Sequence, residues 1–330
     1  MPLVDGFGRV HDDLRVSVTD RCNLRCAYCM PEEPEWFPRE EILRYEEAAR
    51  LVRVAAEQGI RKVRVTGGEP LVRRDVDVFV AAVAAIPGID DLSLTTNGVL
   101  LEKFAPRLAA AGLRRVNVSL DSLRRDRFAR LTGRDRLADV LRGLEAAAAA
   151  GLGPVKINAV LLRGINDDEA IDLVAFGRER GYEVRFIEFM PLDNDRTWDL
   201  SRVVSGASVR RALHARWPLV PDPDRDRRAP ATRFLFADGG GAVGFINSVT
   251  EPFCADCGRL RLTSDGKLRV CLYDDREDDL KAAMRAGATD ADLVARMQAA
   301  VSRKGRGGAV DILERREALP LRRTMHQIGG

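Results

Sequence analysis

A repeating unit between residues 14 and 189 constrains the fold more than any other feature. Six short runs rich in β-branched residues each end in a polar or glycine-rich turn. The expected strands cover residues 14–19, 62–66, 91–96, 115–120, 154–160 and 183–189. Helical segments are expected near residues 40–58, 75–86, 101–111, 136–150 and 167–180. Strands and helices that alternate in this way predict an α/β fold with a parallel sheet and right-handed crossovers, either an incomplete barrel or an open sheet.

The expected strands alternate between apolar and polar residues. Parallel strands that are covered on both faces are usually apolar throughout, but here Leu14 and Val16 share one face and Arg15 lies on the other. Arg64 and Lys156 lie on the polar faces of their own strands, and only six lysines occur among 53 basic residues. Because buried polar groups need partners, these faces predict an interior that holds water, counter-charges or a polar ligand. An antiparallel sheet with one wet face is the alternative, and the helical connections disfavour it.

Asn166 is expected to cap the last of these helices, since three acidic residues follow it directly. After Phe189 the repeat ends. Residues 218–232 predict an exposed loop, 233–249 and 259–271 short strands, 276–300 a helical stretch and 302–308 a mobile segment. The chain is therefore expected to divide into the strand–helix repeat over residues 1–190 and a different C-terminal region over 191–330, which would close the barrel if the repeat forms one.

Composition narrows the class of protein. Hydrophobic residues make up 45% and charged residues 31% of the 330 positions, which is typical of a soluble globular chain. No apolar run reaches the ~18 residues of a membrane span, and the N-terminus lacks the pattern of a signal peptide. We therefore expect a cytoplasmic protein with reduced thiols and no membrane partner. A net charge of +3 gives no reason to expect nucleic acid binding.

Cys22, Cys26 and Cys29 place three thiols within eight residues, directly after the first expected strand. That position is where βα folds build active sites. Zinc would require a fourth ligand, and the only early histidine, His11, lies outside this loop. Three cysteines instead fit a four-iron cluster with one iron open to a small molecule. Three apolar cysteines packed on one helix face remain the structural alternative, because their spacing allows it.

A second trio, Cys254, Cys257 and Cys271, lies near the other end of the chain. A nucleic-acid-binding zinc module would require one closed site of four cysteines, or of two cysteines and two histidines, and the histidines are too scattered for it. Two separate trios do not fit such a closed site.

The first trio, with an aromatic residue before its last cysteine, resembles the cluster motif of radical S-adenosylmethionine enzymes. Residues 66–70, Thr-Gly-Gly-Glu-Pro at the end of the second strand, resemble the motif by which that superfamily binds S-adenosylmethionine. The segments 116–122, 156–158, 163–168 and 185–191, the second trio and the terminal Gly329-Gly330 are similar to one family, GTP 3',8-cyclase of molybdenum cofactor biosynthesis. This resemblance covers essentially the whole chain. It departs from the family at Gly258, where Asn is common.

The resemblance implies an incomplete (βα)6 barrel of the radical S-adenosylmethionine type and two [4Fe–4S] clusters, one on each trio. The first cluster would cleave S-adenosylmethionine to a 5'-deoxyadenosyl radical, and the open iron of the second would bind guanine. Contacts with S-adenosylmethionine are implied for Tyr28, Gly68, Ser119 and Met190. Contacts with the substrates, chiefly GTP, are implied for Arg15, Arg64, Thr95, Lys156, Arg259 and Arg261.

The implied product is (8S)-3',8-cyclo-7,8-dihydroguanosine 5'-triphosphate. The implied partners are GTP, an electron donor and a downstream cyclic pyranopterin monophosphate synthase, and a homodimer is compatible with the sequence. Another radical S-adenosylmethionine enzyme with an auxiliary cluster, such as a peptide maturase, is the alternative. Such enzymes usually have more cysteines in their C-terminal extension. No role is assigned to residues 31–39.

Overall fold

A single curved sheet organises the molecule in the computed structural model, which describes residues 2–31, 33–192, 198–315 and 322–329. The strand order is β12-β11-β10-β1-β2-β3-β4-β5-β6-β9-β8-β7. Six consecutive parallel strands form its centre: β1 (Asp13–Ser17), β2 (Lys62–Thr66), β3 (Asp91–Thr96), β4 (Arg115–Ser119), β5 (Lys156–Leu161) and β6 (Glu183–Glu188). The predicted incomplete (βα)6 barrel is confirmed.

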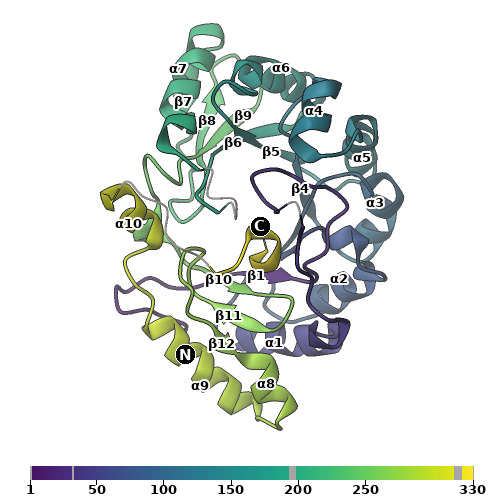
Figure 1. Ribbon diagram of the computed structural model, residues 1–330, viewed down its shortest axis with the longest axis vertical. Coiled ribbons are helices and arrows are strands. Elements are labelled where there is room, and N and C mark those ends of the chain that lie inside the picture. The colour runs from purple at the N-terminus through teal and green to yellow at the C-terminus, as the bar shows by residue number, and fades with distance from the viewer. Residues whose placement is uncertain (1, 32, 193–197, 316–321, 330) are drawn as a thin grey trace.

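The helices between these strands cover the outer face of the sheet (Figure 1). They are α1 (Tyr45–Glu57), α2 (Val76–Ala84), α3 (Leu101–Ala110), α4 (Arg125–Thr132), α5 (Leu137–Ala149) and α6 (Ala170–Arg180). The apolar strand residues face them, and Val16, Val65 and Leu94 are wholly buried. The sequence did not predict α4. This helix has few apolar residues, and its buried side includes only two of them, Phe128 and Leu131, so the helical period is weak.

The C-terminal region extends the sheet at both edges. On one side β9 (Ala242–Ile246) runs parallel to β6, and β8 (Thr232–Phe236) and β7 (Leu219–Pro221) follow. On the other side β10 (Arg259–Leu262) runs parallel to β1, and β11 (Lys267–Arg269) and β12 (Asp278–Asp279) follow. In the described part of the chain β7 and β12 are not hydrogen-bonded to each other, so the sheet stays open.

Further helices surround these extensions: α7 (Gly206–Arg216), α8 (Leu280–Arg285), α9 (Asp290–Ser302), α10 (Gly308–Arg315) and α11 (Met325–Ile328). The described ranges also contain five short 3-10 helices: Arg39–Glu41, Pro70–Val72, Asp167–Glu169, Leu200–Arg202 and Cys254–Asp256. The C-terminal end of the chain lies inside the curve of the sheet, where the last helical turn is yellow in Figure 1. None of the helices in the described ranges is long and apolar enough to cross a membrane.

Asn166 is the N-cap residue of the 3-10 helix Asp167–Glu169 that leads into α6, at the position predicted from the sequence. Its side chain does not cap that helix, because the amide accepts from Leu162 N and donates to the carbonyls of Asp121 and Val160. The mobility of residues 302–308 stays a prediction, and Lys304 within that segment is only 4% exposed.

Candidate active site

The polar faces of the strands line one cavity on the inside of the curved sheet, as the alternation predicted. All six cysteines line it. Of the other residues singled out by the sequence, the cavity is also lined by Arg15, Tyr28, Arg64, Gly68, Thr95, Ser119, Met190, Arg259 and Arg261. Lys156 is not among the lining residues. It lies two positions before Asn158, which does line the cavity, so both side chains are on the inner face of β5.

The first cysteine loop follows β1 and is held by the glycine motif at the end of β2. Gly68 N donates to Thr19 O at 2.7 Å, and Glu69 N donates to Arg21 O at 2.8 Å. A Cβ atom at Gly68 would lie 2.3 Å from Asp20 O, so no side chain fits there. On its other side the loop is fixed to α4, where Arg25 N donates to Thr132 O at 2.7 Å. The loop is thus fixed at both ends before any ligand binds.

Burial and nearby carboxylates act on the thiols of the first trio. Burial, with Glu69 as the next cause, raises the pKa of Cys22 to about 11. Burial and the neighbouring Cys22 raise the pKa of Cys29 to about 12. Burial also raises the pKa of Glu69 to about 7, although it accepts from Thr96 Oγ1 and two backbone N–H groups. Burial therefore disfavours the thiolate form of these cysteines in the protein alone, and a bound metal would have to displace their protons.

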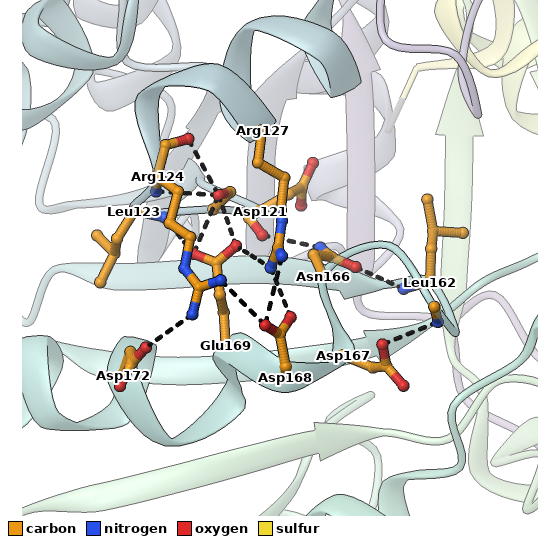
Figure 2. A network of polar contacts seen from close by, with 12 residues as sticks. Asp121, Leu123, Arg124, Arg127, Leu162, Asn166, Asp167, Asp168, Glu169 and Asp172 are labelled. Carbon is orange, nitrogen blue, oxygen red and sulfur yellow. Dashed lines mark hydrogen bonds and ion pairs between the residues drawn. The ribbon is translucent and has the colours of Figure 1, made fainter.

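Tyr28 is tied to the sheet by its hydroxyl group, which donates to Asp121 Oδ2 at 2.6 Å. The other oxygen of Asp121 accepts from Val160 N at 2.8 Å. Figure 2 shows how the backbone of Asp121 itself is held: Asn166 Nδ2 donates to Asp121 O at 2.8 Å. Because its proton is donated to Asp121, the Tyr28 hydroxyl can offer a ligand only an acceptor oxygen, beside the ring and the backbone.

A second layer of the same network fixes the turn after β4 (Figure 2). The buried Glu169 accepts from Ser122 Oγ at 2.7 Å, from Leu123 N at 2.8 Å and from Arg127 Nη1 at 2.7 Å. Arg127 and Arg124 also pair with Asp168. The turn that presents Asp121 to Tyr28 is therefore held by buried hydrogen bonds.

The second trio is surrounded by cations. Lys304 Nζ lies 3.8 Å from Cys257 Sγ and donates to Cys257 O at 2.9 Å. Arg9 Nη1 donates to Cys254 O at 2.8 Å. Burial would raise the pKa of Cys257, but Arg259 and Lys304 lower it to about 6. Gly258, the departure from the family pattern, has no room for a side chain, because a Cβ atom would lie 2.4 Å from Val10 O.

The donor sets suit iron–sulfur clusters. Each trio offers three thiols that influence one another electrostatically on the wall of one cavity, and thiolates favour such clusters. Among the described residues, no three His, Cys, Asp or Glu side chains are grouped to hold a metal ion.

Five of the described arginines line the cavity, and one of them, Arg185, is paired with Glu183. Arg15 on β1 is in register with Arg64 on β2 and with Arg261 on β10. Burial, followed by repulsion from neighbouring arginines, lowers the pKa of Arg15 and of Arg64 to about 9 and that of Arg261 to about 10. In the described part of the chain none of these three, nor Arg259, forms an ion pair with a carboxylate. The Nε atoms of Arg15, Arg64 and Arg259 are buried without hydrogen-bond partners, so the cavity is prepared for an anion.

The C-terminal segment enters the same cavity. Gly329 has φ +89°, and its carbonyl accepts from Arg261 Nη1. A Cβ atom at Gly329 would lie 2.9 Å from Ser17 Cβ, so the close approach requires glycine. The other residue of the predicted tail, Gly330, lies outside the described residues.

Three residues of the site were not singled out from the sequence. Arg185 lines the cavity and donates to Glu183 Oε1 at 2.6 Å, and the alternation along the sixth strand could have identified it. Asp121 follows the fourth strand, where side chains at a carboxyl end are expected. Lys304 had no detectable signal, because its partners Arg259, Cys257 and His11 are 45 to 293 residues away in the sequence.

Comparison with known proteins agrees with this geometry. The model of the radical SAM superfamily matches residues 16–177, and that named Molybdenum Cofactor Synthesis C matches residues 182–309. The GTP 3',8-cyclase of Rhodopirellula baltica is 46% identical over 99% of this chain and 92% of its own length. That of Streptomyces coelicolor is 49% identical over 94% of this chain and 92% of its own.

The chain belongs to the GTP 3',8-cyclase family. Among solved structures, SuiB of Streptococcus suis bound to S-adenosylmethionine aligns with a TM-score of 0.58 at 17% identity. The alignment covers 82% of this chain and 63% of SuiB, and it supports the fold alone. Membership of the radical SAM superfamily implies S-adenosylmethionine and a [4Fe–4S] cluster as cofactors.

Proposed function

We propose that this protein converts GTP to (8S)-3',8-cyclo-7,8-dihydroguanosine 5'-triphosphate, an early step of molybdenum cofactor biosynthesis. One cavity carries the proposal. A cysteine trio lies at each of two places on its wall, and buried arginines with unpartnered Nε atoms line the same wall. The curated relatives named GTP 3',8-cyclase support the same substrate.

Two [4Fe–4S] clusters are part of the proposal. Cys22, Cys26 and Cys29 would hold one, and Cys254, Cys257 and Cys271 the other. When bound, the first cluster supplies the electron that cleaves S-adenosylmethionine. The role of the chain is to orient and shield: Tyr28, Gly68, Ser119 and Met190 are the residues proposed to contact S-adenosylmethionine.

The arginines are proposed to bind the triphosphate. A triphosphate has about four negative charges, and a guanidinium group can donate two parallel hydrogen bonds to it. Arg15, Arg64 and Arg261 lie on three neighbouring strands, so their spacing follows that of the sheet. Thr95, Lys156 and Arg259 complete the proposed contacts. Lys156 Nζ is 4.0 Å from Glu183, and burial lowers its pKa to about 8.

The proposed partners are an electron donor and a downstream cyclic pyranopterin monophosphate synthase. The division of the chain into a barrel region over residues 1–190 and a C-terminal region over 191–330 is also part of the proposal. A reducing compartment such as the cytoplasm is also proposed, because all six cysteines are free thiols. The oligomeric state, including a homodimer, is left to measurement.

Anaerobic incubation of the reconstituted protein with GTP, S-adenosylmethionine and a reductant tests the proposal. Mass analysis should identify the cyclised nucleotide together with 5'-deoxyadenosine. Iron analysis should give about eight atoms per chain, as two four-iron clusters require. Stoichiometric zinc, or 5'-deoxyadenosine without a cyclised nucleotide, would contradict it.

Lys156→Ala offers a sharper test of the phosphate contacts. If Lys156 meets phosphate, the variant should bind GTP about tenfold more weakly and bind guanosine unchanged, since a charged hydrogen bond contributes ~1.5–3 kcal/mol. Lys103→Ala, on the outer helix α3, is the matched control. Equal weakening for GTP and guanosine would remove Lys156 from the phosphate site.

A further inference from the structure

A short loop, residues 33–37, lies between the first cysteine loop and the C-terminal segment. Trp36 and Phe37 are both half-buried, although Glu33 and Glu35 beside them are exposed. Aromatic side chains in an otherwise exposed loop gain by packing on a specific partner. Their partners show what the loop holds together.

On one side the loop is attached to the first cysteine loop. Phe37 N donates to Asp20 Oδ2 at 2.6 Å, and Asp20 is wholly buried. The Arg25 guanidinium lies 5.4 Å from the centroid of the Trp36 ring. The same guanidinium donates to Cys22 O at 2.9 Å and to Leu24 O at 2.8 Å. Trp36 therefore packs on a side chain that is itself fixed to the cysteine loop.

On the other side the loop contacts the C-terminal segment. The Trp36 and His326 rings meet edge to face, with centroids 5.4 Å apart and an interplanar angle of 73°. His326 is 1% exposed and shares a hydrogen bond of 2.7 Å with Thr324 Oγ1. The Arg323 guanidinium lies 5.2 Å from the centroid of Phe37. Each aromatic residue of the loop thus holds one residue of the C-terminal segment.

The position of His326 determines that of Gly329. The two residues are joined by the single helical turn α11, in which Gly329 N donates to Met325 O at 2.9 Å. Gly329 then fits against Ser17 and Thr66 with no space for a Cβ atom, and its carbonyl accepts from Arg261. A turn this short transmits a displacement of its first residues directly to its last.

We propose that residues 33–37 form the seat of the C-terminal segment 322–329. Trp36 is the positioning residue: it is packed between Arg25 and His326, and it thereby fixes the Gly329 carbonyl at Arg261. The cysteine loop does not depend on Trp36 in the same way, because Arg25 has its own hydrogen bonds to Cys22 O and Leu24 O.

Hydrogen–deuterium exchange of the reconstituted protein tests the seat without measuring activity. In Trp36→Ala the amides of Gln327, Ile328 and Gly329 should exchange about tenfold faster, because an edge-to-face pair and the area it buries are lost. Trp36→Phe keeps a ring in place and should restore most of the protection. Iron content should equal that of the wild type in both variants.

Trp217→Ala is the matched control. Trp217 also meets an aromatic ring edge to face, Phe236, at 6.2 Å, and has the Arg178 guanidinium 5.3 Å from its centroid. It lies outside the residues that line the cavity. Unchanged exchange at residues 327–329 in Trp36→Ala would overturn the proposal. Equal acceleration in Trp36→Ala and Trp217→Ala would also overturn it, because general destabilisation would then explain the effect.

A second consequence rests on the proposed function. If the seat fixes Gly329 in the working enzyme, Trp36→Ala should produce 5'-deoxyadenosine at the wild-type rate but form about tenfold less cyclised nucleotide per 5'-deoxyadenosine. A wild-type protein that formed no cyclised nucleotide would refute the proposed function, while the exchange measurement would still decide whether Trp36 seats the C-terminal segment.

Discussion

Cys22 and Cys257 line the same cavity but differ in their electrostatic surroundings. Burial and, after it, Glu69 raise the pKa of Cys22 to about 11. At Cys257, Arg259 and Lys304 outweigh burial and lower the pKa to about 6, whereas burial raises the pKa of Cys254 in the same trio. The cations therefore act on one thiol of the second trio. A positive surrounding suits a polyanionic nucleotide better than a cationic sulfonium cofactor.

Loss of one cysteine from each trio should separate the two roles most strongly. Cys26→Ala should abolish 5'-deoxyadenosine formation, because the first cluster loses a ligand. Cys271→Ala should instead retain an iron–sulfur signal from the first trio and 5'-deoxyadenosine formation while cyclisation is lost. Iron content, 5'-deoxyadenosine and nucleotide product measured on the same samples check this. A wild-type rate of 5'-deoxyadenosine formation by Cys26→Ala would contradict the role proposed for the first trio.

Thiol reactivity in the metal-free, reduced protein tests the electrostatic contrast directly. At pH 7 Cys257 should be alkylated by iodoacetamide roughly a hundredfold faster than Cys22, because the larger thiolate fraction outweighs its lower nucleophilicity. Below pH 6 the Cys257 rate should fall as the thiolate is protonated, whereas the Cys22 rate should still be rising at pH 9. Peptide mass spectrometry gives both rates. In urea, where the chain is unfolded, Cys257 and Cys22 should be alkylated at similar rates. Similar rates in the folded protein would contradict the predicted difference between their surroundings.

Lys304 should account for part of this difference. Lys304→Met removes the cation 3.8 Å from Cys257 Sγ and should move the midpoint of the pH profile of Cys257 alkylation upward by about one unit, which corresponds to about 1.4 kcal/mol. Lys281→Met is the matched control, because Lys281 donates to Glu41 O on the outer surface. If the midpoint for Cys257 stays at its wild-type pH in Lys304→Met, Lys304 does not contribute to the positive surrounding.

Tyr28→Phe should have the smallest effect and should be confined to the first trio. The change leaves Asp121 Oδ2 without its donor inside the protein and should lower the free energy of unfolding of the metal-free protein by ~1 kcal/mol. Tyr45→Phe, whose hydroxyl donates to Arg74 O at the surface, should change it by a few tenths of a kcal/mol. Denaturant titration with reductant present measures the free energy of unfolding of both variants. Equal decreases would show that the Tyr28–Asp121 hydrogen bond stabilises the protein no more than the surface hydrogen bond of Tyr45.

Strand alternation made most of the barrel predictable. Arg15, Arg64, Thr95 and Ser119 were placed on an inner polar face because the period of a strand is two, and the structure has each of them on the cavity wall. The cysteine trios were visible because clustered thiols in a chain with six cysteines are unusual.

What the sequence could not supply depends on contacts between distant segments. Arg9, Lys304 and the second trio meet only in the folded chain. Asn166 lies at a helix start, as its acidic neighbours indicate, but its amide bonds to the ends of β4 and β5 instead of capping that helix. The packing of Trp36 on His326 joins positions 290 residues apart, and no local period encodes it.

The row formed by Arg261, Arg15 and Arg64 has a consequence for the lifetime of the protein. Like charges on neighbouring strands destabilise a sheet, so the ligand-free chain is less stable than its apolar core alone would allow. An anion that binds the row only in the folded state would raise the free energy of unfolding by ~2.7 kcal/mol at a concentration one hundred times its Kd. Proteases act on unfolded chains. The amount of this protein in a cell would then follow the supply of the nucleotide it binds.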